Sequence, residues 1–275
     1  MMQDPSSQAA QEHLVNRAFD AQSGEFDTIT TQNPMEVLYR DIVRDHVMQY
    51  LRKSDSLLEL NCGTGLDAIY FSEQGALVHA TDNSLGMLDQ LRQKLAKSGA
   101  PKSLTVQQCS FHSLSDIKPE KPFRHVFSNF GGLNCSPHIH TVIHQLDHLL
   151  ETGAMVHLVL IGPICLWEMG AALKGRFSYA FRRFKKQGAV SKIEGNYFTT
   201  YYYSASYIQN CFGAHYKRVA LKSLGCFLPP TYKSEFPKAW PKTFALLKFL
   251  ESKTRHLWPF NRIGDLYILT VIKTS

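Results

Sequence analysis

The stretch LLELNCGTGLDAIYF, Leu57 to Phe71, decides the fold class of this chain. Its first four residues, Leu57 to Leu60, form a short apolar run that predicts a buried strand. Apolar residues then recur at helical spacing from Ala68 onward, so Asn61 to Gly65 must be the strand-to-helix turn. Backbone N–H groups converge at such a turn, next to the carboxylate of Glu59. The stretch therefore predicts a nucleotide-binding loop.

Strands and helices alternate along the chain after this loop. Further strands are predicted at Leu77 to Thr81, Leu104 to Gln107, Val126 to Phe130 and Ala154 to Ile161. Helices are predicted from Leu66, at Leu85 to Lys97 and at His140 to Leu150. This alternation predicts an α/β fold with a doubly wound parallel sheet. Two late strands, Tyr216 to Leu224 and Asp265 to Ile272, are expected to pair antiparallel at one edge.

The remaining segments are expected to cover the sheet domain. Residues 1–55 are predicted to form N-terminal lid helices, and the sheet domain is assigned to 56–163 and 213–275. A cap insertion at 164–212 combines a helix rich in Phe and Arg with an aromatic hairpin, and a second insertion occupies 229–262. Both insertions follow late strands, where parallel sheets bind ligands, so they are expected to fold over that edge.

Composition restricts the class of protein. With 275 residues and 44% hydrophobic content, the chain can bury a sizeable core. The sequence has neither an apolar run long enough to span a membrane nor a signal-peptide pattern, and its six cysteines include no C-x-x-C pair. We therefore expect a cytoplasmic protein with reduced thiols. The formal net charge of +7 favours anionic partners.

The glycine loop alone fits two cofactors. Gly63, Gly65 and Ala68 satisfy the G-x-G-x-x-A fingerprint of NAD-dependent dehydrogenases. A dehydrogenase more often opens directly on its glycine strand, whereas here a helical region of about 55 residues precedes it. A Rossmann oxidoreductase therefore stays as an alternative.

The run from Glu59 to Gly65, ELNCGTG, resembles the E-x-G-x-G-x-G loop of class I S-adenosylmethionine-dependent methyltransferases. This resemblance extends through VHATDNSLGML, CSFHSL and HVFSNFGGLN, and it implies a Rossmann-like seven-stranded sheet. The N-terminal segment AFDAQSGEFDTITTQNPMEVLYR is similar to the lid helix of the ubiquinone/menaquinone-type small-molecule branch. The cofactor-binding residues that the resemblance implies are Phe26, Arg40, Glu59, Asn61, Cys62, Gly63, Thr64, Gly65, Asp82, Asn83, Met87, Ser110, Phe111, Asn129, Phe130 and Gly131.

Within this resemblance, Asp82 corresponds to the acid on the ribose hydroxyls, and Phe111 lies beside the adenine. Three positions depart from the family pattern. Asn61 replaces the first glycine, which is acceptable because Asn tolerates a left-handed backbone. Ser110 stands where an Asp often reads the adenine amine, which weakens that contact, and His125 stands where an Asp usually opens the fourth strand.

The function that the resemblance implies is methyl transfer from S-adenosylmethionine to a small, apolar or aromatic acceptor under the cap. The loop residue His138 is a candidate general base. His140, His144 and His148 share a helix face but lack a tidy ligand set, so no metal is predicted. Aromatic side chains are expected to enclose the acceptor cavity: Tyr39, Trp167, Phe177, Tyr197, Tyr201 and Tyr203.

The basic stretch Lys174 to Lys186 leaves other functions open. It is expected to be an amphipathic helix that packs on the core, that contacts a membrane surface or an anionic substrate, or that docks RNA or protein for methylation. Nucleic acid is the less favoured partner, because no RNA-reading motif occurs elsewhere. A non-catalytic cofactor-binding protein is a further alternative, and the sequence does not choose among O, N and C acceptors.

Overall fold

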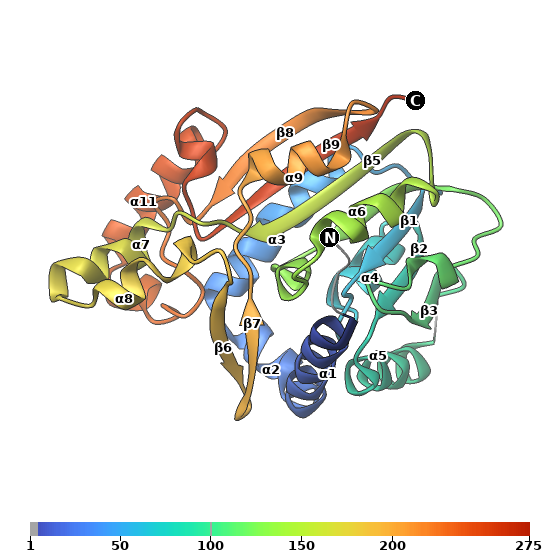
Figure 1. Cartoon of the computed structure of the whole chain (residues 1–275), viewed down its shortest axis with the longest axis horizontal. Coiled ribbons are helices and arrows are strands. Elements are labelled where there is room, and N and C mark those ends of the chain that lie inside the picture. Colours follow the sequence, from blue (N-terminus) through green and yellow to red (C-terminus); the bar gives the residue numbers. More distant parts are fainter. Residues whose placement is uncertain (1–4, 100) are drawn as a thin grey trace.

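The computed structural model describes residues 5–99 and 101–275; residues 1–4 of the predicted lid lie outside the described chain. A seven-stranded sheet forms its centre, in the order β3-β2-β1-β4-β5-β9-β8 (Figure 1). Its strands are β1 (Ser56–Leu60), β2 (Leu77–Asp82), β3 (Leu104–Gln108), β4 (Phe123–Ser128), β5 (Leu150–Ile161), β8 (Tyr216–Leu224) and β9 (Leu266–Lys273). The first five strands pair in parallel, and β9 pairs antiparallel with both β5 and β8. The prediction of a doubly wound α/β sheet is confirmed.

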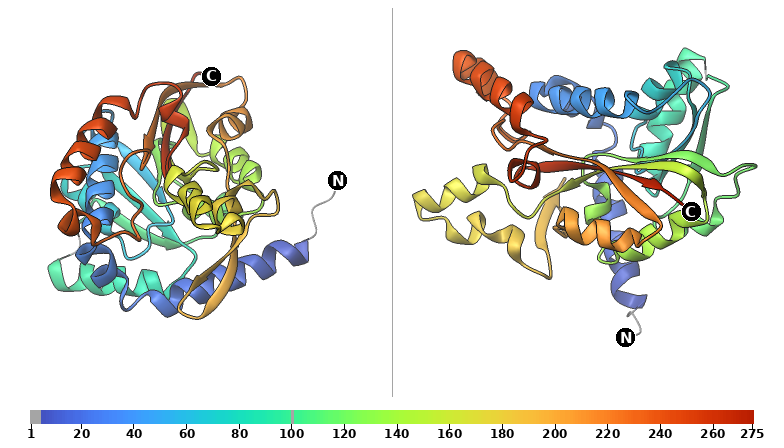
Figure 2. Two further views of the ribbon diagram at one scale, coloured as in Figure 1. Left: turned by 90° about the vertical axis from the view of Figure 1, so that its left-hand side faces the viewer. Right: turned by 90° about the horizontal axis from the view of Figure 1, so that it is seen from above.

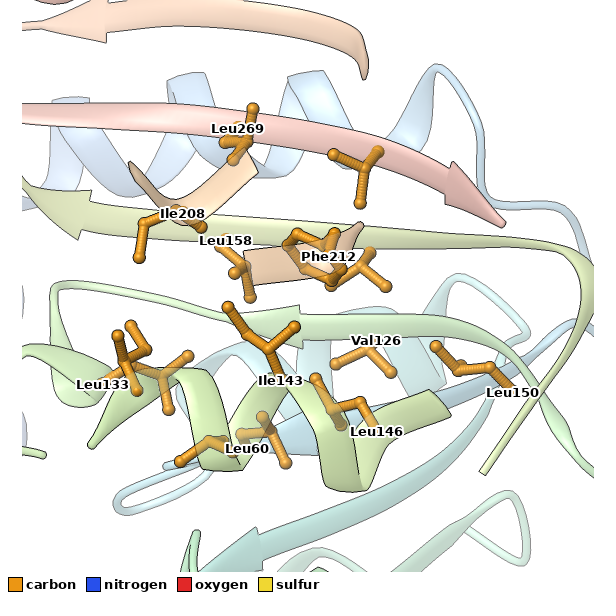
Figure 3. Close-up of a cluster of buried hydrophobic side chains, with 14 of the residues drawn as sticks. Leu60, Val126, Leu133, Ile143, Leu146, Leu150, Leu158, Ile208, Phe212 and Leu269 are labelled. Atoms are coloured by element: carbon orange, nitrogen blue, oxygen red, sulfur yellow. The ribbon is translucent and has the colours of Figure 1, made fainter. Parts of the chain in front are cut away.

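Helices cover both faces of this sheet. One face carries α3 (Pro34–Met48), α4 (Leu66–Glu73) and α5 (Leu85–Ser98), whose buried residues pack in one core cluster. The other face carries α6 (Ile139–Asp147) and α9 (Ala205–Phe212). In Figure 3, Ile143 and Leu146 of α6 and Ile208 of α9 meet side chains of the strands. Residues 205–212, which the sequence placed in the cap, are therefore part of the sheet domain's core.

Two predicted elements end earlier than their apolar patterns suggest. The fourth strand stops at Ser128 rather than Phe130, because Phe130 and Gly131 adopt left-handed backbone angles, with φ of 49° and 72°. The following helix ends at Asp147, and Leu150 already begins β5. Apolar periodicity cannot mark these ends, since buried residues continue through the turns.

Three elements lie across the carboxyl ends of the parallel strands. Helix α1 (Pro5–Gln22) packs against α5 and against the hairpin of β6 (Ala189–Ile193) and β7 (Asn196–Thr200). Helix α2 (Phe26–Gln32) follows it and leads into α3. The left panel of Figure 2 shows α1 running beneath the sheet beside the hairpin. We call α1, α2 and this hairpin the cover.

The predicted basic helix is not continuous. Residues 166–184 form short turns instead: α7 (Leu166–Met169), η3 (Gly170–Lys174), α8 (Phe177–Ala180) and η4 (Arg182–Phe184). Gly175 interrupts them with a left-handed φ of 74°. The second insertion holds α10 (Phe236–Ala239), α11 (Pro241–Thr254) and η5 (Phe260–Arg262). In the described part of the chain, no helix is both long and apolar enough to cross a membrane.

Candidate functional site

A cavity of about 340 Å³ lies at the carboxyl ends of the parallel strands, between the sheet and the cover. Strand β1 sits between β2 and β4 there, at the point where the chain reverses its direction of winding. Open α/β sheets bind ligands at this position. The lining residues are Glu12, Val15, Asn16, Phe19, Phe26, Glu36, Arg40, Glu59, Asn61, Cys62, Gly63, Leu66, Asp67, Asp82, Asn83, Ser84, Met87, Ser110, Phe111, His112, Asn129, Phe130, Gly132, Cys135, Ser136, Pro137, Ile193 and Thr231.

The loop after β1 has the backbone conformation that a close ligand approach requires. Asn61, Gly63 and Gly65 all have positive φ angles, of 45°, 56° and 79°. A Cβ atom at Gly65 would lie 2.3 Å from Cδ1 of Leu91 in α5, so only glycine fits between the loop and this helix. The loop therefore brings backbone N–H groups to the start of α4, as the sequence predicted.

Asp82 ends β2 and holds this loop in place. Its carboxylate accepts hydrogen bonds from the backbone N–H of Gly63 at 2.8 Å and of Ser84 at 2.9 Å. Burial raises the pKa of Asp82, and the backbone hydrogen bonds lower it. One carboxylate thus connects two loops of the cavity wall. Its roughly four acceptor positions exceed the three backbone N–H groups that bind it, those of Gly63, Asn83 and Ser84, so it keeps acceptor capacity for a ligand.

Glu59, at the end of β1, is a buried acid with an unsatisfied carboxylate oxygen. It is 2% exposed, and its Oε2 atom has no hydrogen-bond partner among the described residues. Burial raises the pKa of Glu59 well above its ordinary value; the charge of Asp67 raises it further, and Arg40 and Arg44 lower it. A buried carboxylate without a partner is costly, so this atom is suited to a hydrogen-bond donor or a cation from a ligand.

Asp67, in the first turn of α4, organises charges beside Glu59. It forms ion pairs with Arg40 and, at 2.7 Å, with Arg44, both from α3. The side-chain amide of Asn129 also donates to it, at 2.9 Å. The guanidinium of Arg40 then lies over the Phe130 ring, 4.7 Å from its centroid. Helix α3 therefore contributes a fixed positive charge to the cavity wall.

The turn after β4 is packed tightly against the glycine loop. The Asn61 side chain donates to the Asn129 carbonyl at 3.0 Å and accepts from the Ser128 hydroxyl at 2.6 Å. A Cβ atom at Gly132 would lie 2.4 Å from Cγ of Asn61. Asn61, which departs from the family's glycine, thus uses its amide to connect the ends of β1 and β4.

A second polar group lies on the opposite wall, after β3. The Ser110 hydroxyl donates to a carboxylate oxygen of Glu12, from α1, at 2.9 Å. The His112 ring lies 3.1 Å from the Ser136 hydroxyl, and its Nδ1 atom is buried without a partner among the described residues. Burial lowers the pKa of His112, whereas the charge of Glu12 raises it. An acid from the cover therefore stands beside Ser110.

Specific contacts attach the cover to the cavity rim. Asp27 of α2 accepts hydrogen bonds from the Thr64 hydroxyl and, at 2.7 Å, from the Lys94 ammonium. Asp20 of α1 accepts from the Ser84 hydroxyl at 2.6 Å and from the backbone N–H of Gly86 at 2.9 Å. The glycine loop and α5 are thus tied directly to the first two helices.

Most residues assigned to the cofactor by resemblance line this cavity, with three exceptions: Thr64, Gly65 and Gly131. Thr64 and Gly65 shape the loop instead, through the contacts with Asp27 and Leu91. His138 also lies outside the lining, although its neighbour Pro137 belongs to it. His138 flanks the start of α6, and its backbone N–H donates to the hydroxyl of the lining residue Ser136 at 3.1 Å.

The prediction of an aromatic wall from the insertions and Tyr39 was wrong. The six residues Tyr39, Trp167, Phe177, Tyr197, Tyr201 and Tyr203 do not contribute to the lining of this cavity. Tyr39 is fully buried in the core, where its hydroxyl donates to the Pro229 carbonyl. Trp167 packs on Phe236, while Phe177 and Tyr197 are mostly exposed.

The rings of Tyr201 and Tyr203 stack on each other, and the Tyr203 hydroxyl donates to the Ser136 carbonyl. The aromatic residues that do line the cavity are Phe19, Phe26, Phe111 and Phe130. The lining also contains Phe19 and the acids Glu12, Glu36 and Asp67, which the sequence did not predict. All four lie on helices. In the sequence they appear only as polar or aromatic residues of predicted amphipathic helices, a pattern that does not identify a ligand site.

One other cluster has the side chains of a metal site. Ligand atoms of Cys165, Glu168 and Asp265 lie within 4.8 Å of one another. The Arg183 guanidinium donates to both carboxylates, at 2.6 Å each, and Arg182 donates to Glu168. These cations already neutralise the cluster, so it acts as a buried ionic network.

Comparisons with known proteins agree with this geometry. Residues 57–153 match the family model of the methyltransferase domain. The fold is similar to that of a S-adenosylmethionine-dependent methyltransferase from Mesorhizobium loti (13% identity, TM-score 0.53, covering 83% of this chain and 96% of that one). It is also similar to the 1,6-didemethyltoxoflavin-N1-methyltransferase of Burkholderia thailandensis (14% identity, TM-score 0.57, covering 100% of this chain and 92% of that one). A third similar structure is that of the [4+2]-cyclase SpnF (12% identity, TM-score 0.61, covering 95% of this chain and 96% of that one). A search of curated protein sequences found no match.

The matched domain contains the glycine loop, Asp82 and the turn after β4. Residues 57–153 therefore form a methyltransferase domain, and the chain around them has the fold of S-adenosylmethionine-dependent methyltransferases. Its Rossmann-like sheet of seven strands has the fold that the resemblance implied.

Proposed function

We propose that this methyltransferase transfers a methyl group to a small molecule that shares the cavity with the cofactor. The observation that carries the proposal is the position of the cover, since α1, α2 and the β6–β7 hairpin lie over the carboxyl edge of the sheet and contribute Phe19, Phe26 and Ile193 to the cavity wall. A cavity of about 340 Å³ falls in the range of small-molecule sites. A macromolecular acceptor would instead need an open groove.

The residues present fit S-adenosylmethionine. The unpartnered Oε2 of Glu59 is suited to the cofactor's ammonium group, and the free acceptor positions of Asp82 are suited to the ribose hydroxyls. The positive charge of Arg40 is suited to the cofactor's carboxylate. Phe26, Met87 and Phe111 would supply the apolar walls for the remainder. The N-terminal position of Phe26 supports kinship with the ubiquinone/menaquinone-type branch.

Glu12 fills a gap in the family pattern. Ser110 replaces the Asp that often reads the adenine amine, but the Glu12 carboxylate lies within a hydrogen bond of the Ser110 hydroxyl. We therefore assign the recognition of the adenine amine to Glu12, an acceptor that comes from α1 rather than from the strand end. This assignment couples closure of the cover to cofactor binding.

When bound, S-adenosylmethionine supplies an electrophilic methyl group. The chain's own contribution is to align the acceptor and to exclude water, and alignment alone can lower a barrier by about 7–11 kcal/mol. Glu36 of α3 lines the cavity one helical turn before Arg40. Burial raises the pKa of Glu36, while Arg40 and Thr30 lower it. A carboxylate with a raised pKa is a better proton acceptor, so we assign Glu36 as the base for an acceptor that loses a proton.

A macromolecular acceptor is less well supported. The sequence predicted that such an acceptor would dock on a continuous basic helix at 174–186, but these residues form short helical turns. Arg182 and Arg183 within it are already paired with Glu168. The six free cysteines support a cytoplasmic location for the proposed enzyme, because oxidising compartments favour disulfides.

The test is incubation of the enzyme with methyl-labelled cofactor and an extract that contains both metabolites and macromolecules. We expect label in a low-mass product and no increase of label in protein or RNA. Label in a macromolecular fraction alone would refute the small-molecule proposal. Once the product is known, Glu36→Gln should lower kcat without changing the affinity for S-adenosylhomocysteine; an unchanged kcat would remove Glu36 from the reaction.

A further inference from the structure

Two neighbouring segments at one end of the molecule expose large apolar side chains. They are the turns from α7 to η4 and the helices from α10 to η5, which project beyond the sheet in Figure 1 and in the right panel of Figure 2. Rings of Trp167 and Phe236 join them, 5.5 Å apart. The exposed apolar residues are Leu173 (93%), Trp258 (77%), Trp240 (62%), Phe177 (61%), Leu246 and Phe249 (57% each), Phe184 (51%), Leu257 (47%), Leu166 (46%) and Phe181 (43%). We call this set the docking surface.

The same two segments concentrate positive charge. With the residues that flank them, as 166–192 and 229–262, they carry 14 of the chain's 30 Lys and Arg residues but 3 of its 23 Asp and Glu residues. Two of these three acids, Glu168 and Glu251, are buried. The remainder of the chain therefore has more acidic than basic side chains, and the positive net charge of the protein resides at this end.

The cations on this surface face outward. None of the exposed ones forms a salt bridge with an acid in the described part of the chain: Lys174, Arg176, Lys185, Lys186, Lys192, Lys233, Lys238, Lys242, Lys248, Lys253 and Arg262. Arg176, Arg182 and Lys185 also line an open groove of about 810 Å³ beside Phe177. A groove of this kind is suited to an anionic headgroup.

We propose that the docking surface binds the face of an anionic lipid bilayer. Leu173, Leu246 and Phe249 would enter the boundary between headgroups and acyl chains, while the lysines extend toward the phosphates. Tryptophans are favoured at this depth because their rings have apolar and polar parts, as Trp240 and Trp258 do. An aliphatic side chain as exposed as Leu173 favours acyl chains over nucleic acid, which offers stacking surfaces to aromatic rings only.

In this proposal the protein binds the bilayer surface without crossing it, and the binding does not depend on which acceptor the enzyme methylates. Residues next to both segments nevertheless reach the cavity wall: Thr231, which precedes α10, and Ile193, at the end of β6, both belong to the lining. A protein docked through this surface would therefore hold one side of its cavity toward the bilayer.

Vesicle sedimentation of the full chain tests the proposal. We expect binding to vesicles of phosphatidylcholine mixed with phosphatidylglycerol, and weaker binding to phosphatidylcholine alone. Leu173→Ser combined with Phe249→Ser should lower the binding at least about tenfold, because two large apolar groups no longer enter the bilayer. The matched control is Leu77→Ser with Val219→Ser, two exposed apolar residues on strands outside the docking surface, which should leave binding unchanged.

Charge is tested in the same way. The substitutions Lys174→Gln, Lys186→Gln and Lys248→Gln should weaken binding to anionic vesicles by about fivefold per cation, whereas the controls Lys53→Gln, Lys102→Gln and Lys121→Gln should have a much smaller effect. Two further measurements can overturn the proposal. Light scattering that shows a dimer dissociated by the Leu173/Phe249 substitutions would assign the surface to a second copy of the chain. RNA binding that depends on the lysines alone, without vesicle binding, would assign it to nucleic acid. Absence of binding to both kinds of vesicle would also refute it.

Discussion

The side chain of Gln11 bridges the N-terminal helix to the hairpin: its amide nitrogen donates to the Thr199 carbonyl at 2.7 Å, and its amide oxygen accepts from the Thr199 N–H at 3.3 Å. The same nitrogen reaches the Cys135 carbonyl at 3.2 Å. Gln11 is 8% exposed, and the Phe19 and Phe198 rings meet beside it along the same interface. The two halves of the cover are thus joined over the cavity.

Removal of this connection should loosen the cover. Gln11→Ala leaves a buried carbonyl and N–H without partners, a cost of about 1–3 kcal/mol for closure. We expect faster amide hydrogen exchange in α1 and the hairpin, and weaker binding of S-adenosylhomocysteine. Gln93→Ala, at an exposed position of α5, is the control. Unchanged exchange in α1 would show that Gln11 does not hold the cover closed.

Glu12 should determine selectivity for the adenine amine. Glu12→Gln should weaken binding of S-adenosylhomocysteine by about 1–3 kcal/mol, because a charge-assisted hydrogen bond is lost. S-inosylhomocysteine, which lacks the amine, should bind the variant and the original chain with more similar affinities. Glu25→Gln, exposed between α1 and α2, serves as the control. Equal losses for both ligands would mean that Glu12 acts only on the fold of α1.

Gly132→Ala tests the close packing of the turn after β4 against the glycine loop. The new Cβ would displace the Asn61 side chain and with it the hydrogen bonds to Ser128 and Asn129. Overpacking of this kind costs about 1–3 kcal/mol, measured as a lower urea midpoint together with weaker cofactor binding. Gly170→Ala, where the added methyl meets no atom within 4 Å, should have little effect. Equal midpoints for the two variants would contradict this packing argument.

A buried histidine chain should make the fold sensitive to acid. Lys222 donates to His46 Nδ1 at 2.9 Å, and His46 is linked through Thr270 to His157, His125 and Asp55. Burial, together with the positive charges of Lys222 and Arg255, lowers the pKa of His46 from 6.5 to about 3. Between these two pKa values, His46 binds a proton in the unfolded chain but not in the folded chain. The free energy of unfolding therefore decreases as the pH falls from 6.5 toward 3.

For this one group the slope is at most about 1.4 kcal/mol per pH unit. Urea unfolding between pH 7 and pH 4 measures it. His46→Gln should flatten the dependence, whereas the exposed His13→Gln should preserve it. A dependence that is as steep in the His46 variant as in the original chain would contradict the assignment.

The sheet and the cofactor side of the site were predictable from sequence because both are local. A strand, its following loop and the next helix leave their periods in consecutive residues, so Glu59, Gly63 and Asp82 could be placed together. Asn129 and Phe130 followed from the same reasoning, although their strand is shorter than predicted.

The residues that the N-terminal helices contribute to the cavity depend on tertiary placement and were not predictable in the same way. Glu12 reaches the cavity because α1 crosses the strand ends, and Glu36 because the first turn of α3 borders the cavity. Nothing in their sequence neighbourhoods fixes these placements. The prediction that aromatic residues of the insertions line the cavity failed for a related reason. Composition cannot distinguish a core tyrosine such as Tyr39 from an exposed phenylalanine such as Phe177.

Calorimetric titration with S-adenosylhomocysteine tests the central claim, that the cavity between the strand ends and the cover holds the cofactor. We expect binding by the original chain, a loss of about 1–3 kcal/mol in Asp82→Asn and no loss in Asp89→Asn, an exposed acid of α5. Because burial raises the pKa of Glu59 and the cofactor's ammonium would favour its charged form, binding should release protons and strengthen as the pH rises. Absence of binding, or equal affinity in the Asp82 and Asp89 variants, would contradict the account.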